Sequence, residues 1–68
     1  MISYAPLWKL LQERGITTYV LREKENLGGG TVQRLQQNMP VSTTTLDTLC
    51  SILNCRLQDI AEYIPDQK

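Results

Sequence analysis

Hydrophobic positions recur every three to four residues along most of this 68-residue chain, the spacing of helices that bury one face. Leu7, Leu10 and Leu11 begin the pattern. Pro6 suits the first turn of a helix, because the N–H that proline lacks would have no partner there. The pattern predicts a first helix from about Tyr4 to Arg14.

The next segment predicts two short helices joined by a tight turn. Gly15 ends the first helix, and Thr17 can cap a second helix over about Thr18 to Lys24. Asn26 lies where the chain must turn and tolerates a left-handed conformation. A third helix is expected to begin near Gly29 or Gly30 and to end near Gln37. The second and third helices are expected to bury a common apolar face, formed by Leu21, Leu27, Val32 and Leu35. This layout, over about residues 17–37, predicts a helix-turn-helix.

Two further helices follow in the pattern. Pro40 prevents the third helix from continuing, Ser42 is the expected cap of a fourth, and Asn54 ends that helix in a left-handed conformation. The apolar stripe of the fourth helix is Leu46, Leu49, Cys50 and Leu53. A short fifth helix before Pro65 should turn Leu57, Ile60, Ala61 and Ile64 inward. We therefore expect a single compact all-α, five-helix domain over residues 1–68, with a loose tail at 66–68.

The composition of the chain disfavours several classes of protein. Domains of this size bury only about 60% of the surface of the unfolded chain, so dimerisation would help to stabilise this one. No apolar run approaches the roughly 20 residues that span a bilayer, which predicts a soluble, cytoplasmic protein. The chain has two cysteines and no histidine, so core packing is the favoured role of Cys50 and Cys55, with a disulfide or a metal site as the alternative. Without histidine or a phosphate-binding glycine motif, we expect no enzyme activity, catalytic residue, cofactor or metal.

The formal net charge is zero, but the charges are unevenly distributed. Residues 1–38 carry five cationic and three anionic side chains, a net +2, and residues 39–68 carry two and four, a net −2. The basic excess coincides with the predicted helix-turn-helix, as attraction to DNA would require. An ordinary solvated surface explains it about as well.

The segments PLWKLL, RGITTYVLREK, TVQRL, PVSTTTLDTLCSILNC and LQDIAEYIP lie in order between Pro6 and Pro65. Together they resemble the short helix-turn-helix transcriptional regulators of the lambda repressor and Cro (Xre-like) superfamily, which are typically bacterial or phage-encoded. The resemblance implies a five-helix DNA-binding fold, a recognition helix in the major groove of double-stranded DNA, and a homodimer on a two-fold-related site.

The resemblance also assigns roles along the motif. Thr17 and Thr18 match the start of the second helix, which approaches the phosphate backbone. Gly29, Gly30 and Arg34 match positions that reach base edges, and the flanking contacts are Thr31 and Gln33. From their chemistry alone, Arg34 suits guanine, and Gln33, Gln37 and Asn38 suit adenine edges or phosphates.

Four alternatives stay open at this point. The glycines at 28–30 either fray the third helix and forgo base contacts, or let its backbone approach a phosphate. Arg34 either contacts a base or simply lies on the solvent-exposed face of an amphipathic helix. The protein is a sequence-specific regulator, predicted to be a repressor, or a degenerate helix-turn-helix that serves as a protein-interaction module of the antitoxin or anti-repressor type. The chain ends, 2–4 and 62–64, could associate with each other or form a dimer surface.

Overall fold

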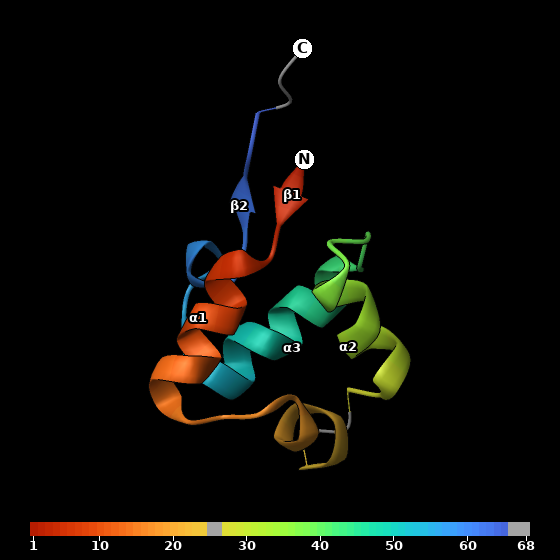
Figure 1. Cartoon of the computed structure of the whole chain (residues 1–68), viewed down its shortest axis with the longest axis vertical. Helices are drawn as coiled ribbons and strands as arrows, with labels where there is room; N and C mark the ends of the chain where they lie inside the picture. Colours follow the sequence, from red (N-terminus) through yellow and green to blue (C-terminus); the bar gives the residue numbers. More distant parts are fainter. Residues whose placement is uncertain (25–26, 66–68) are drawn as a thin grey trace.

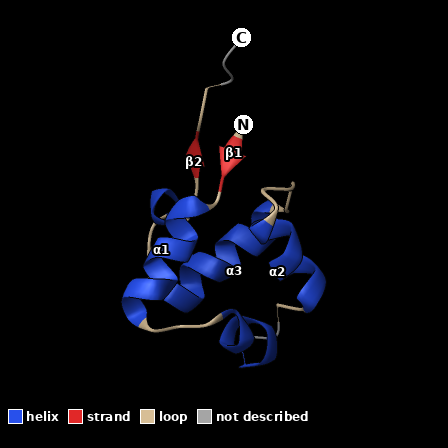
Figure 2. Ribbon diagram, in the orientation of Figure 1, coloured by secondary structure: helices blue, strands red, loops and turns tan. Residues whose placement is uncertain are grey.

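The computed structural model describes residues 1–24 and 27–65, so the predicted turn at Asn26 and the loose tail at 66–68 lie outside the described residues. The elements in chain order are β1 (Ile2–Ser3), α1 (Ala5–Arg14), the π-type helix η1 (Val20–Lys24), α2 (Gly29–Gln36), α3 (Thr43–Leu53), the 3-10 turn η2 (Leu57–Asp59) and β2 (Glu62–Tyr63). Helices make up most of the described chain (Figure 2). The prediction of a mostly helical fold is confirmed.

The predicted helix ends are confirmed by their backbone geometry and hydrogen bonds. Pro6 lies in the first turn of α1, and Gly15 follows this helix in the left-handed conformation, with φ of 67°. The Oγ of Ser42 accepts a hydrogen bond from the Thr45 amide at 3.2 Å and caps α3. Asn54 ends α3 with φ of 50°. α1 and α3 therefore begin or end at residues whose local chemistry favours that change of conformation.

The core lies between α1, α2 and α3, with η1 closing it at the end of the molecule opposite the two chain termini (Figure 1). Its buried hydrophobic residues are Tyr4, Leu7, Leu11, Leu21, Val32, Leu35, Leu49, Leu53 and Ile60. Cys50 and Cys55 are free thiols packed against this core, in agreement with the predicted core role. Tyr4 is an unexpected member, because the sequence placed it at a helix end or an interface.

The predicted fifth helix is wrong. From Asn54 to Pro65, all of which the structure describes, the chain forms only the three-residue turn η2 and then extends into β2. Ile60 is fully buried as predicted, but Leu57 is 53% exposed and Ile64 is 41% exposed. The described chain thus has four helices and one 3-10 turn. The three-to-four spacing of apolar residues fits a single turn as well as a helix, so it could not separate the two.

The two ends of the chain pair as antiparallel strands, with Ile2 opposite Tyr63 and Ser3 opposite Glu62. The Met1 ammonium donates to the Ile64 carbonyl at 2.6 Å, and the Ile64 amide donates back to the Met1 carbonyl at 2.8 Å. The hypothesis that these ends associate is therefore confirmed within one chain. This pairing explains the missing helix, because the ladder requires extended backbone at residues 62–64.

A second long-range contact joins α1 to α3. The Arg14 guanidinium, in the last turn of α1, donates through Nη1 to the backbone carbonyl of Leu53, the last residue of α3. A cation at this end of a helix interacts favourably with the helix dipole and satisfies a carbonyl that has no partner within the helix. Arg14 therefore stabilises the packing of two helices.

No helix in the described part of the chain combines the length and the apolar character that crossing a bilayer demands.

Candidate nucleic-acid interface

The first helix of the predicted motif begins as the sequence indicated. The Oγ1 of Thr17 accepts a hydrogen bond from the Val20 amide at 3.3 Å, and the Thr17 carbonyl accepts from the Val20 and Leu21 amides at 3.1 and 3.3 Å. Thr18 and Tyr19 are α-helical, and the wider π-type pattern follows over Val20–Lys24. Thr17 is exposed and Thr18 half-buried, so both lie at the surface where this helix starts.

The second helix of the motif, α2, begins at Gly29 despite the three glycines. Gly28 precedes it with φ of 82°, a backbone conformation that favours glycine, and the Gly28 carbonyl accepts from the Val32 amide at 3.3 Å. The glycines have therefore not displaced the helix by a turn. The first amides of α2 have no acceptor within the helix and are available to an external one.

The outer face of α2 is polar and exposed. Val32 and Leu35 are buried, and the positions opposite them on the helix are all exposed: Gly30, Gln33, Arg34 and Gln37. Thr31 is half-buried beside this face. The helix packs against η1, so Thr17 and Thr18, which lie just before η1, belong to the same helix-turn-helix unit (Figure 1). These residues define the candidate interface.

Asn38 has a structural contact that the sequence did not indicate. It follows α2 in the left-handed conformation, with φ of 55°, and its Oδ1 accepts a hydrogen bond from the Tyr4 amide at 2.9 Å. This oxygen is therefore occupied inside the protein, although the residue as a whole is exposed.

Arg22 is a neighbour of α2 that sequence reasoning did not place at the interface. A Cβ on Gly29 would lie 3.5 Å from the Arg22 Cδ, so the aliphatic part of this arginine runs along the start of α2. Its Nε lies 3.7 Å from a carboxylate oxygen of Glu23, and both side chains are about half exposed. Such a surface pair is weak, so the guanidinium can exchange this partner for a phosphate. The only feature of the sequence that could have placed Arg22 at the interface is its position in the helix directly before the polar helix α2.

The thiols do not form a reactive centre. Burial first, and then the neighbouring Cys50 thiol, raise the pKa of Cys55 above its ordinary value, with Arg14 opposing the shift. A raised pKa leaves less of the nucleophilic thiolate at neutral pH. Among the described residues, no three or more Cys, Asp or Glu side chains are grouped so that they could hold a metal ion.

Comparison with known proteins agrees with this geometry. The family of Cro/C1-type helix-turn-helix DNA-binding domains matches residues 6–66. The chain belongs to this family, and the predicted DNA-binding regulator of the lambda repressor and Cro superfamily is confirmed. The family is one of DNA-binding regulators that are not enzymes, as the sequence also predicted.

One solved structure is similar over almost the whole chain. It is a crystal structure of transcriptional regulator VanUg, Form II. It superposes with a TM-score of 0.88 at 40% sequence identity, covering 96% of this chain and 87% of that one. No curated protein matches the chain.

Proposed function

We propose that this protein is a sequence-specific repressor that binds double-stranded DNA as a homodimer and places α2 in the major groove. The observation that carries the proposal is the polar, exposed outer face of α2, with Arg34 on it, in a chain of the Cro/C1-type family. The similar solved structure, VanUg, is that of a transcriptional regulator, which supports the regulatory role. Repression is the simplest output, because occupancy of a DNA site alone excludes other proteins from it.

Arg34 is the proposed base-reading residue. Its side chain is exposed. Among the described residues, the structure gives one ion pair between side chains, Arg22 with Glu23, and that pair does not involve Arg34. A guanidinium can donate two parallel hydrogen bonds to O6 and N7 of guanine. Gln33 and Gln37, on the same face, suit adenine edges or phosphates.

The remaining contacts are proposed to be with the backbone of the DNA. Thr17 and Thr18 approach one phosphate from the residues just before η1, and Thr31 and Asn38 flank α2 at its two ends. Asn38 can contribute only its amide nitrogen, because its Oδ1 already accepts from Tyr4. These contacts set the orientation of α2 and carry little sequence information.

Gly29 and Gly30 are proposed to allow a close approach of the α2 backbone to a phosphate. A Cβ on Gly30 would meet nothing within 4 Å in the protein, so the core does not require glycine at this position. The helix start offers unpaired amides and the positive end of the helix dipole. Arg22, which runs beside Gly29, would add a cation to the same phosphate site.

Selection of bound duplexes from a randomised DNA pool at moderate salt tests the proposal. The wild type should enrich a palindromic motif, and Arg34→Ala should lose preference at one position of each half-site, at a cost of about 1–3 kcal/mol. Arg56→Ala is the matched control, because it removes the same charge from an exposed residue at η2 and should leave the motif unchanged.

Salt dependence provides a second readout. Affinity should fall steeply as salt rises, because each phosphate contact releases counterions from the DNA. Absence of any enriched motif would contradict the proposal and favour the protein-interaction module.

A further inference from the structure

The two cysteines lie on either side of the bend that ends α3. Cys50 is in the last turn of the helix, Asn54 bends the chain with φ of 50°, and the Cys55 amide donates to the Cys50 carbonyl at 3.1 Å. This hydrogen bond is that of a Schellman motif, in which the side chains of the two bonded residues commonly contact each other. The end of the helix therefore places one thiol beside the other.

The same hydrogen bond limits the distance between the two Cα atoms. With standard backbone dimensions, an amide that donates to a carbonyl at 3.1 Å holds the two Cα atoms within about 7 Å. Disulfides join residues whose Cα atoms are usually about 4.4–6.8 Å apart. The thiols also interact, because the Cys50 side chain raises the pKa of Cys55 through both its charge and a hydrogen bond. The backbone thus has a spacing that a disulfide can span.

Cys50 can be reached by a small reagent. Both cysteines are half-buried free thiols. An open hollow of about 270 Å³ lies against Cys50, and the rest of its lining is Thr43, Leu46, Asp47 and Leu57. A small molecule that enters this hollow therefore approaches the Cys50 side chain without unfolding of α3.

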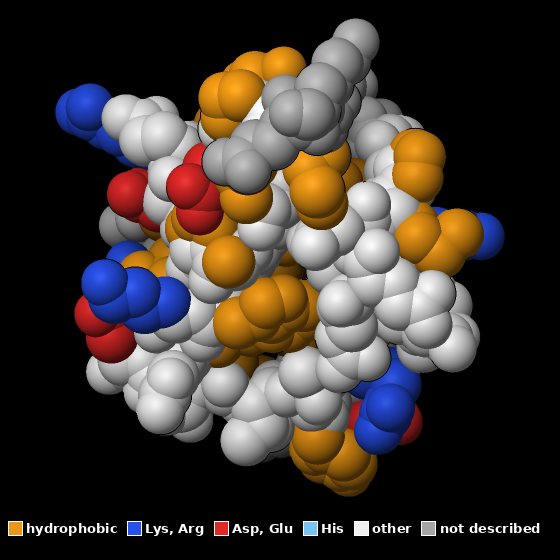
Figure 3. All heavy atoms as spheres, turned by 45° about the horizontal axis from the view of Figure 1, so that its top comes forward, with side chains coloured by type: hydrophobic (Ala, Val, Ile, Leu, Met, Phe, Trp, Pro, Cys, Tyr) orange, Lys and Arg blue, Asp and Glu red, His pale blue; other side chains and the backbone are white. Residues whose placement is uncertain are grey.

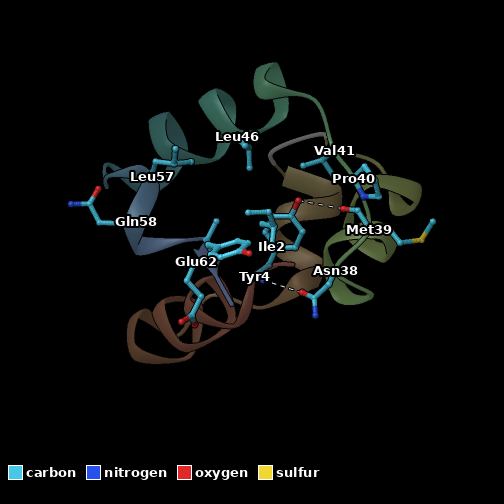
Figure 4. A pocket seen from close by; sticks show the side chains of 12 residues that line it. Ile2, Tyr4, Asn38, Met39, Pro40, Val41, Leu46, Leu57, Gln58 and Glu62 are labelled. Carbon is cyan, nitrogen blue, oxygen red and sulfur yellow. Dashed lines mark hydrogen bonds between the residues drawn. The ribbon is translucent and has the colours of Figure 1, made fainter. Parts of the chain in front are cut away.

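A disulfide at this bend would hold the following segment against α3. Cys55 leads into η2, which packs on α3 and carries Leu57. Leu57 and Leu46 line both the hollow beside Cys50 and a larger apolar groove of about 650 Å³ (Figure 4). Hydrophobic side chains gather around that groove at the surface (Figure 3). The direction in which the chain leaves Cys55 therefore sets the position of one wall of the groove.

The raised pKa of Cys55 affects the rate of disulfide formation more than its equilibrium. Attack on a disulfide needs a thiolate, so a raised pKa slows the step in which Cys55 attacks. The equilibrium depends instead on the effective concentration of one thiol at the other, which rises when the fold holds them close. The two thiols are therefore poor nucleophiles for catalysis and still well placed for a bond with each other.

We propose that Cys50 and Cys55 form a reversible disulfide within one chain, by exchange with a low-molecular-weight disulfide. The Cys50 thiolate attacks one sulfur of the reagent, which forms a mixed disulfide and releases one reagent thiol. The Cys55 thiolate then attacks the Cys50 sulfur, which closes the bond and releases the second reagent thiol. The protein loses two electrons and two protons, and the reagent is reduced to two thiols that carry those protons. The proposal goes beyond the proposed function and does not depend on it.

The disulfide should stabilise the fold. It closes a loop over residues 50–55, which restricts the unfolded chain while the folded chain already holds the two residues together. For a loop of this length without strain, the chain-entropy model gives an increase of about 40-fold in the folding equilibrium constant. By linkage, the effective concentration of the two thiols must be higher in the folded chain than in the unfolded chain by the same factor.

Equilibration of the full chain in mixtures of reduced and oxidised glutathione tests the proposal. After acid quenching, mass spectrometry separates the dithiol, the mixed disulfide and the internal disulfide, which is lighter than the dithiol by two hydrogens. Because the chain has only two cysteines, the assignment is unambiguous. The matched control is the same chain in concentrated urea. The effective concentration should be at least about fivefold higher in the folded protein, with about 40-fold as the limit without strain.

Two variants and a second measurement complete the test. Cys50→Ser and Cys55→Ser should each stop at the mixed disulfide. Urea denaturation of the oxidised and the reduced wild type should give the same factor as the glutathione equilibrium. A folded-to-unfolded ratio below about fivefold, or oxidation that yields only mixed disulfides or bonds between two chains, would overturn the proposal.

A ¹H–¹⁵N NMR spectrum locates the change in the folded protein. Oxidation should shift the amide signals of residues 50–57 and leave those of Gln33 and Arg34 in place. Shifts spread over the whole spectrum would show that the bond requires a different fold and would overturn the proposal. The result is separate from the duplex selection: a chain that forms the disulfide but enriches no DNA motif would refute the proposed function alone.

Discussion

The Asn38 side chain accepts a hydrogen bond from the Tyr4 amide through Oδ1 at 2.9 Å, which joins the end of α2 to the start of α1. The Tyr4 hydroxyl returns the contact by donating to the Met39 carbonyl at 3.3 Å. Tyr4 is 4% exposed and follows β1 directly. One asparagine thus serves both the turn after α2 and the start of α1.

Asn38→Ala should lower the free energy of unfolding by about 2 kcal/mol. It leaves the Tyr4 amide without its acceptor and places a Cβ-bearing residue without a local hydrogen bond at φ of 55°. Urea denaturation measures the change. Asn38→Gly separates the two causes: it removes the acceptor but relieves the backbone, so it should cost only about 1 kcal/mol. Equal losses for the two variants would contradict the backbone contribution.

Gly28 and Gly30 should respond oppositely to alanine. Gly28→Ala should destabilise the protein by about 1 kcal/mol or more, because φ of 82° is strained for any residue with a Cβ. Gly30→Ala should stabilise it by about 0.4–1 kcal/mol, because Gly30 is helical and a Cβ there meets open space. Thermal unfolding of the two variants is the measurement, and a destabilising Gly30→Ala would show that α2 needs glycine for its fold.

Arg14→Ala should destabilise the protein by about 1 kcal/mol, because the Leu53 carbonyl at the end of α3 loses a charged donor. Lys9→Ala is the control, since it removes a cation from an exposed position of α1 for which the described residues give no ion pair. Chemical denaturation at low and at high salt compares them. A loss for Lys9→Ala as large as for Arg14→Ala would assign the effect to charge alone.

Because of the Cys55 thiol, the free energy of unfolding should fall at alkaline pH. Its pKa is raised in the folded protein, chiefly by burial, so the folded state holds this proton more tightly than the unfolded state does. The resulting stabilisation is complete below the ordinary pKa of 9.0 and is lost as the pH rises through the raised pKa of the folded state.

Unfolding free energies measured from pH 8 to pH 11 test this, with Cys55→Ala as the reference that removes the thiol but keeps every other titrating group. The difference in unfolding free energy between the wild type and Cys55→Ala should shrink above pH 9.0. A constant difference would contradict the raised pKa.

Local chemistry in the sequence determined the helices and their ends. Gly15, Thr17, Ser42 and Asn54 act within one or two turns of where they stand, so their roles could be predicted and are confirmed. The polar outer face of α2 was equally predictable, because helical periodicity alone places Gln33 and Arg34 opposite Val32 and Leu35. Which bases or phosphates these side chains contact remains a prediction.

Only the tertiary structure determined the conformation of the C-terminal segment and which distant residues contact one another. The spacing of Leu57, Ile60 and Ile64 predicted a helix, but pairing with β1 across the length of the chain made the segment a single turn and a strand. The Asn38 contact with Tyr4 and the Arg14 contact with Leu53 likewise join residues more than 30 positions apart. Side-chain spacing reports which face of an element is apolar, whereas these pairings depend on where the folded chain brings remote backbone groups within hydrogen-bond distance.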